Sequence, residues 1–126
     1  MARFAITGAE IFDGIKRRAQ HALIIEGARI LDLVRESELP ADLAAQRLDG
    51  GLLAPGFIDV QVNGGGGVLL NDARTADGVR TICDAHARYG TTALLPTLIT
   101  DARSVTAQAV AAVRQAIANQ VPGCLG

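Results

Sequence analysis

Three polar side chains occupy alternate positions just before a run of glycines. Asp59, Gln61 and Asn63 lie in the segment FIDVQVN, and the next four residues are all glycine. Strand periodicity places residues two apart on the same side, so the three polar groups are predicted to face one interior. Burying an acid or amide without a partner costs about 1 to 3 kcal/mol. The pattern therefore predicts that water, a metal or a ligand satisfies these groups or, alternatively, that Gln61 and Asn63 only cap the strand and anchor the glycine loop.

The segments around these residues alternate between strand and helix patterns. In order they are a strand at 52–62, a helix at 76–89, a strand at 91–99 and a helix at 101–119. The first is a continuous apolar run, which predicts a strand buried on both faces. Thr100 or Asp101 is available as the N-cap of the second helix. This order predicts right-handed βαβ units with a parallel sheet, whose ligand-binding residues gather at the carboxyl ends of the strands.

The first half of the chain has shorter, strand-like segments. Residues 22–34 read ALIIEGARILDLV, which predicts a hairpin with its turn at Glu26 and Gly27. Residues 37–46 are polar and predict a loop or a single helical turn. We therefore predict a small β layer in residues 1–52 and an α/β unit in residues 53–126.

Composition limits the possible partners. The 126 residues are about half of the roughly 250 that a closed (β/α)8 barrel needs. The net charge of -1 argues against nucleic-acid binding. No segment approaches the roughly 18 apolar residues of a membrane helix, and Glu10 and Asp13 interrupt the N-terminal segment before a signal sequence could form. We expect a soluble cytoplasmic protein with a small-molecule partner, and neither a nucleic acid nor a membrane.

The glycine run has two interpretations, contact with a ligand or only a sharp turn of the chain from strand to helix. Gly64, Gly65, Gly66 and Gly67 could bring backbone amides close to a sugar phosphate. No Lys-Ser or Lys-Thr pair follows them, so the sequence favours close packing of this loop against an active-site floor over direct phosphate binding.

The histidines and cysteines favour structural interpretations. His86 lies three residues after Cys83 on the apolar face of the helix at 76–89, where a buried histidine is favoured over a shared metal site. His21 precedes a strand and is expected at the surface. Cys83 and Cys124 are in no paired-ligand spacing, which predicts two reduced structural thiols.

Two motifs carry a resemblance to a known family. PGFIDVQVNGGGGVLLND, from Pro55 to Asp72, and YGTTALLPTLIT, from Tyr89 to Thr100, resemble the N-terminal portion of the N-acetylglucosamine-6-phosphate deacetylases of the amidohydrolase superfamily. The resemblance extends over essentially the whole chain. It implies an α/β fold, with a small N-terminal β-sandwich layer in residues 1–52. Residues 53–126 would hold the first two βα units of a metal-dependent-hydrolase (β/α)8 barrel, which is incomplete in this chain.

The resemblance also implies an activity in amino-sugar metabolism. Members hydrolyse N-acetylglucosamine 6-phosphate to glucosamine 6-phosphate and acetate, and the full-length protein would be a homo-oligomer. One divalent metal, zinc or similar, would lower the pKa of its bound water, and an aspartate would act as general acid and base. The metal ligands and this aspartate match no position here, so the isolated chain is predicted to bind no metal and to be inactive. A third strand after Gly126 is expected to carry a metal-binding glutamate.

Gln61 and Asn63 occupy the positions of a His-x-His pair that binds one metal of a binuclear site in the wider superfamily. Amide oxygens are poor zinc ligands beside imidazole nitrogens, so the second metal is expected to be absent and the amides to bind water or substrate. Asp59 would orient neighbouring groups or, as the sequence favours, serve only as a hydrogen-bonded structural acid. Two alternatives remain: a non-catalytic fragment or assembly module, and another amidohydrolase, which would be expected to carry His-x-His.

Overall fold

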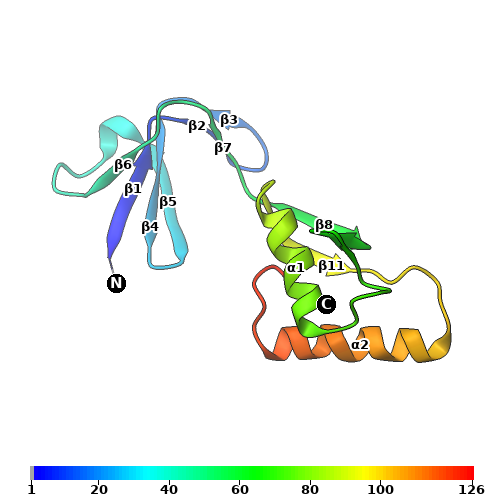
Figure 1. The fold of residues 1–126 in the computed structure, drawn as a ribbon. Helices are drawn as coiled ribbons and strands as arrows, with labels where there is room; N and C mark the ends of the chain where they lie inside the picture. Colours follow the sequence, from blue (N-terminus) through cyan, green and yellow to red (C-terminus); the bar gives the residue numbers. More distant parts are fainter. Residues whose placement is uncertain (1) are drawn as a thin grey trace. The chain divides into compact units, whose positions relative to one another are not determined.

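The computed structural model describes residues 2–126 and divides into two compact units, Met1–Pro55 and Gly56–Gly126 (Figure 1). The division lies three residues beyond the boundary predicted between residues 52 and 53. The first unit contains strands and a short 3-10 turn, and the second contains both α-helices. The fold is therefore mixed α/β with small sheets.

The N-terminal unit is built from short strands in two sheets. One sheet has the order β5-β4-β1-β6 and the other β3-β2-β7. The strands are β1 (Arg3–Thr7), β2 (Glu10–Phe12), β3 (Arg17–Arg18), β4 (His21–Glu26), β5 (Arg29–Arg35), β6 (Ala45–Arg47) and β7 (Leu52–Leu53). The predicted hairpin is confirmed as β4 and β5. Its turn lies one residue later than predicted, because Glu26 pairs with Arg29 and Gly27 has a φ of 58°.

The polar segment at 37–46 is only partly a loop. The 3-10 turn η1 (Glu36–Glu38) begins just before it, and β6 begins within it at Ala45. Here β6 pairs in parallel with β1, and Gln46 lies opposite Ile6. This short edge strand lacks an apolar alternation, so the sequence pattern gave no sign of it.

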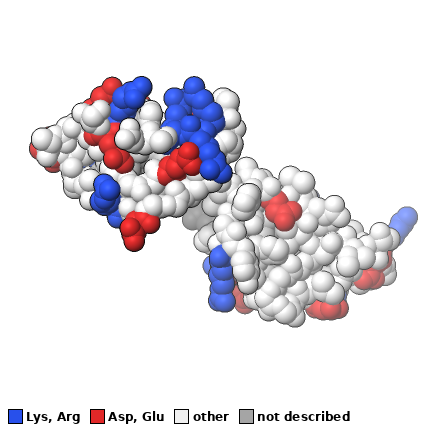
Figure 2. All heavy atoms as spheres, turned by 90° about the horizontal axis from the view of Figure 1, so that it is seen from above, with Lys and Arg blue, Asp and Glu red and all other residues white. Residues whose placement is uncertain are grey.

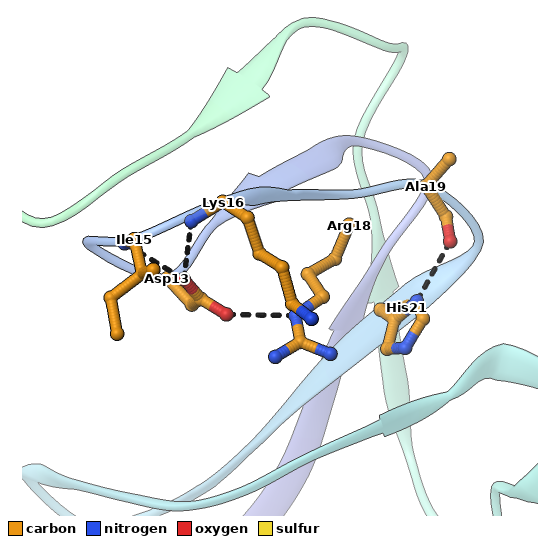
Figure 3. A network of polar contacts seen from close by, with 6 residues as sticks. All are labelled: Asp13, Ile15, Lys16, Arg18, Ala19 and His21. Atoms are coloured by element: carbon orange, nitrogen blue, oxygen red, sulfur yellow. Dashed lines mark hydrogen bonds and ion pairs between the residues drawn. The ribbon is translucent and has the colours of Figure 1, made fainter.

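A turn in the N-terminal unit is organised around one carboxylate (Figure 3). The backbone N–H groups of Ile15 and Lys16 each donate to Asp13 Oδ1 at 2.9 Å. Arg18 Nε donates to Asp13 Oδ2 at 2.7 Å. These bonds, led by the one from Lys16, stabilise the charged form and lower the pKa of Asp13 to about 2.

His21 stands near this turn and begins β4. Its ring is half-buried, with Nδ1 2.7 Å from the carbonyl oxygen of Ala19 (Figure 3). The expectation of a surface position is therefore met only in part.

The C-terminal unit has the predicted strand, helix, strand, helix order. Its elements are β8 (Phe57–Val62), β9 (Gly64–Gly65), β10 (Val68–Leu69), α1 (Ala76–Ala87), β11 (Thr91–Pro96) and α2 (Arg103–Ala118). As predicted, β8 and β11 are parallel neighbours. Leu94 of β11 also forms a parallel bridge with Cys124, so the chain after α2 returns beside β11 (Figure 1). Both helices, β8 and β11 contribute to one core, which contains Val62, Leu70, Val79, Ile82, Cys83, Leu94, Ala109, Val113, Ala116 and Val121.

The apolar run at 52–62 is not one strand buried on both faces, and this prediction was wrong. Residues 52 and 53 form β7 in the other unit, and Pro55 and Gly56 separate them from β8. Phe57, Ile58 and Val60 are 68%, 65% and 70% exposed. The physical reason is that β8 has a single described neighbour, β11, and meets the core only at its carboxyl end.

The start of α2 also differs from the prediction. Its N-cap is Ala102, which has no capping side chain. Asp101 instead accepts the N–H of Ala102 at 2.7 Å, one residue too early to cap the helix. By contrast, α1 begins with the conventional cap, in which Thr75 Oγ1 accepts the N–H of Gly78 at 3.0 Å.

Charged side chains of both signs lie next to one another on the face of the N-terminal unit seen in Figure 2. On the corresponding face of the C-terminal unit they are scattered more widely. Among residues 2–126, neither helix has the length and apolar character needed to cross a membrane.

Candidate functional site

The candidate site lies where β8 and β11 end, and Asn63 ties the two ends together. Its Nδ2 donates to the carbonyl oxygen of Thr97 at 2.9 Å. Beside this bond, the N–H of Thr97 donates to the carbonyl oxygen of Val62 at 2.7 Å, and the N–H of Leu70 donates to the carbonyl oxygen of Asn63 at 2.9 Å. The side chain of Asn63 therefore links the ends of β8 and β11, while its Oδ1 makes no hydrogen bond to residues 2–126. Anchoring of the glycine loop by this side chain stays a prediction.

Gln61 lies two residues earlier and is exposed. Its backbone N–H donates to Asp59 Oδ1 at 3.1 Å. No hydrogen bond from its side-chain amide to the described part of the chain is formed. Gln61 thus offers a free donor and a free acceptor to solvent or to a ligand, whereas Asp59 orients the backbone beside it.

A β-bulge interrupts β8 at these residues. Asp59 lies opposite Leu94 and Val62 lies opposite Pro96, so three steps along β8 match two along β11. A bulge re-aims the side chains that follow it. Simple alternation therefore no longer dictates that Asp59 shares a face with the two amides, and a common face for Gln61 and Asn63 stays a prediction.

The four glycines form a tight hairpin. Gly64 pairs with Leu69 and Gly65 with Val68, which leaves Gly66 and Gly67 as the two turn residues. Their φ values of 62° and 84° are typical of a type I′ turn. The run is therefore a reversal of the chain between β9 and β10, not a direct passage from strand to helix.

This hairpin packs against α1. A Cβ at Gly65 would lie 2.9 Å from Cδ2 of His86, and a Cβ at Gly66 would lie 3.0 Å from Cγ2 of Thr81. His86 Nε2 is also 3.0 Å from the carbonyl oxygen of Gly64. His86 is half-buried, so the expectation of a buried histidine is met only in part. The surface against which the glycines pack is α1, and packing of this loop against an active-site floor stays a prediction.

Asn71 is a residue of this region that the sequence reasoning missed. Its Nδ2 donates to the carbonyl oxygen of Ile99 at 3.0 Å and to Asp101 Oδ2 at 2.9 Å, while its Oδ1 accepts the N–H of Ile99 at 3.0 Å. The bond from Asn71, with that from the N–H of Ala102, lowers the pKa of Asp101. Asn71 joins the loop after the hairpin to the loop after β11. The only signal in the sequence was a polar residue directly after the apolar pair Leu69 and Leu70.

The chemistry available at this edge is hydrogen bonding by neutral amides. Within residues 2–126, no group of three or more His, Cys, Asp or Glu side chains is placed to hold a metal ion. Amide oxygens alone are weak ligands for zinc. The residues present can bind and orient a polar ligand, and they do not by themselves fit a divalent metal.

Comparison with known proteins relates this arrangement to one family. Residues 3–53 match the NagA composite domain. The N-acetylgalactosamine-6-phosphate deacetylase of Shewanella sp. (strain ANA-3) is 49% identical over 90 residues, which cover 71% of this chain and 23% of the relative. The N-acetylglucosamine-6-phosphate deacetylase of Haemophilus influenzae is 32% identical over 98 residues, covering 78% of this chain and 26% of the relative.

A solved structure extends the likeness to the fold. The crystal structure of N-acetylglucosamine-6-phosphate deacetylase from Pasteurella multocida superposes with a TM-score of 0.85 at 29% identity, over 92% of this chain and 31% of that one. The chain is similar to the N-terminal part of the N-acetylglucosamine-6-phosphate deacetylases. It spans about a quarter of the length of the curated deacetylases just described. The resemblance seen in the QVNG and LPTLIT motifs is thereby confirmed.

Proposed function

We propose that this chain is the N-terminal part of a deacetylase that hydrolyses the acetamide of an N-acetylhexosamine 6-phosphate, releasing acetate and the free amino sugar phosphate. The observation that carries the proposal is the 49% identity to a deacetylase of this class, together with the amides of Gln61 and Asn63 at the carboxyl end of β8. In parallel α/β folds this end of the sheet is where ligands bind.

In this proposal the two amides have different tasks. Gln61 is exposed and its side chain is free of hydrogen bonds to residues 2–126, so it binds a hydroxyl group, the acetamide or an ordered water of the substrate complex. Asn63 uses Nδ2 to hold Thr97, which leaves Oδ1 as an acceptor for a ligand. Asp59 keeps the backbone of Gln61 in place through its bond to the N–H. Binding and orientation, rather than proton transfer, are the contributions of these residues.

A divalent metal, which the family resemblance implies, is not matched by the residues of this chain. Ligands for such a metal would come from outside residues 2–126. The general acid and base would likewise lie elsewhere. A homo-oligomeric assembly and a cytoplasmic location belong to the same proposal.

Two sugars fit the proposal, and they differ only in the configuration at one carbon. The relative of 49% identity is named for N-acetylgalactosamine 6-phosphate, and the one of 32% identity for N-acetylglucosamine 6-phosphate. Because of the higher identity, N-acetylgalactosamine 6-phosphate is a candidate substrate alongside N-acetylglucosamine 6-phosphate.

The test is an acetate-release assay with both sugar phosphates. The enzyme is the product of the complete reading frame that encodes these residues, and the 126-residue chain alone is assayed in parallel. We expect turnover of at least one sugar phosphate by the former and none by the latter. Failure of the complete product to release acetate from either sugar would refute the proposed activity. Turnover by the 126-residue chain would show that catalysis needs no residue beyond it.

A further inference from the structure

Two cysteines far apart in sequence come together in the core of the C-terminal unit. Cys83 lies on α1 and is 3% exposed. Cys124 packs against the same core cluster and is half-buried. Hydrogen bonds hold the chain here, since the N–H of Leu94 donates to the carbonyl oxygen of Gly123 at 2.7 Å and that of Leu125 to the carbonyl oxygen of Leu94 at 3.0 Å. The segment carrying Cys124 is thus tied to β11 directly beside α1.

The backbone beside Cys124 closely approaches Cys83. A Cβ built at Gly123 would lie 3.7 Å from the Cβ of Cys83, and Cys124 is the next residue. The thiols also influence each other. Burial raises the pKa of Cys83 to about 11, with Cys124 among the further causes. Burial also raises the pKa of Cys124, while a hydrogen bond with the side chain of Cys83 acts in the opposite direction.

A small reagent can approach this pair. A cavity of about 210 Å³ opens beside Cys83 and is lined by Asp84, Thr92, Pro122 and Gly123 among others. Cys124 is itself partly exposed. The pair therefore differs from two thiols sealed in a core, because one is reachable from solvent and the other borders a cavity.

We propose that Cys83 and Cys124 form a dithiol site for small disulfide oxidants such as oxidised glutathione, and that the reaction joins α1 to residues 121–126 by an intramolecular disulfide. The thiolate of Cys124 attacks one sulfur of the oxidant and releases one glutathione thiolate. The thiolate of Cys83 then attacks the Cys124 sulfur of the mixed disulfide and releases the second. Two protein thiols are oxidised, one small disulfide is reduced, and the two protons pass to the released thiolates.

The disulfide would enclose β11 and α2 in a covalent loop between residues 83 and 124. Closing such a loop restricts the unfolded chain and stabilises the folded one. Since burial holds both thiols in the protonated form, and only the thiolate attacks, the reaction is slow at neutral pH and faster in alkaline solution. The reduced pair is therefore the resting state, and oxidation adds a covalent cross-link to the C-terminal unit.

The experiment treats the folded protein with oxidised glutathione in mildly alkaline buffer and follows free thiols and intact mass. We expect both thiols to be lost, the mass to fall by two hydrogen atoms, and the melting temperature to rise by several degrees. The Cys83→Ser variant should instead accumulate a stable glutathione adduct at Cys124. Peptide mapping without reductant locates the bond, and a non-reducing gel shows whether it is intramolecular.

Three results would overturn the proposal, and none of them depends on a variant. The wild-type protein could keep two free thiols while a urea-unfolded sample reacts, it could retain a stable glutathione adduct at Cys124, or it could form only intermolecular disulfides. The first would show that the folded protein offers no thiol to the oxidant, and the other two would show that the two sulfurs do not meet in the folded state.

Discussion

The two units of the chain are stabilised in different ways. In the described part of the N-terminal unit, the buried hydrophobic residues are three alanines and two isoleucines, namely Ala5, Ala9, Ile11, Ala22 and Ile24. In the C-terminal unit two helices and two strands enclose a continuous core that includes Leu70, Val79, Ile82 and Leu94, each at most 1% exposed. The first unit relies more on strand hydrogen bonds and on turns such as that around Asp13, whereas the second relies on packing. We therefore expect core substitutions to cost more in the second unit.

The largest expected effect comes from a large-to-small change in the better-packed core. Ile82→Ala should lower the free energy of unfolding of the C-terminal unit by about 3 to 5 kcal/mol, because Ile82 is fully buried. Ile11→Ala in the N-terminal unit should cost nearer about 2 kcal/mol, since its buried neighbours are small. Ile117→Ala, at a 44% exposed site on α2, is the control and should cost about 1 kcal/mol or less. Native-state hydrogen exchange measures the stability of each unit separately. Equal losses of stability for Ile82→Ala and Ile11→Ala would contradict the inference that the C-terminal unit relies more on core packing.

The next effect concerns the glycine hairpin, whose packing belongs to the C-terminal unit. Gly65→Ala should cost about 1 to 3 kcal/mol, because the new Cβ would overlap the ring of His86. Urea unfolding followed by circular dichroism measures this cost. Adding His86→Ala should recover part of the loss by removing the obstructing ring. If the double variant loses more free energy of unfolding than the two single variants together, the cause is not steric.

The third prediction uses pH to test the N-terminal unit. The folded pKa of Asp13 is about 2 against an ordinary value of 3.8, so its charged form stabilises the folded state above pH 4. That contribution is lost as the pH falls through about 2. Asp13→Asn should reduce the stability of this unit at neutral pH and flatten its decline between about pH 4 and 2. Hydrogen exchange across this pH range measures the stability of both proteins. If the stability of the variant declines as steeply as that of the wild type, other carboxylates cause the decline.

The sequence predicted the helices and the parallel strands because their signals are local. Apolar spacing located α1 within two residues of its observed end, and the βαβ order is enough to predict parallel pairing. Phe57, Ile58 and Val60 show what the pattern cannot reveal: an apolar strand is buried only if a neighbour covers it. The prediction of the α2 N-cap was wrong for another reason. Asp101 is a good capping residue by type, but it is bonded to Asn71 from another loop.

The candidate site was predicted in part. The spacing of Gln61 and Asn63 and the glycine run pointed to the carboxyl end of β8, and the structure shows that edge with the hairpin beside it. The bulge between Asp59 and Val62, the bond from Asn63 to Thr97 and the contact of Gly65 with His86 all depend on residues more than twenty positions apart or on strand register. Such contacts carry no short-range pattern that a single sequence could reveal.

The two amides at the end of β8 have separate proposed roles, in which Gln61 binds substrate and Asn63 holds the strand ends. The measurement compares Gln61→Ala and Asn63→Ala in the product of the complete reading frame, by acetate release and by unfolding. Gln46→Ala, at an exposed strand position in the N-terminal unit, is the control.

We predict that Gln61→Ala keeps the wild-type stability and loses roughly tenfold or more in kcat/KM, as expected when a substrate hydrogen bond is removed. Asn63→Ala should lower the free energy of unfolding by about 1 kcal/mol through the lost bond to Thr97. An active protein whose kcat/KM is unchanged by Gln61→Ala would contradict the proposed substrate-binding role of Gln61.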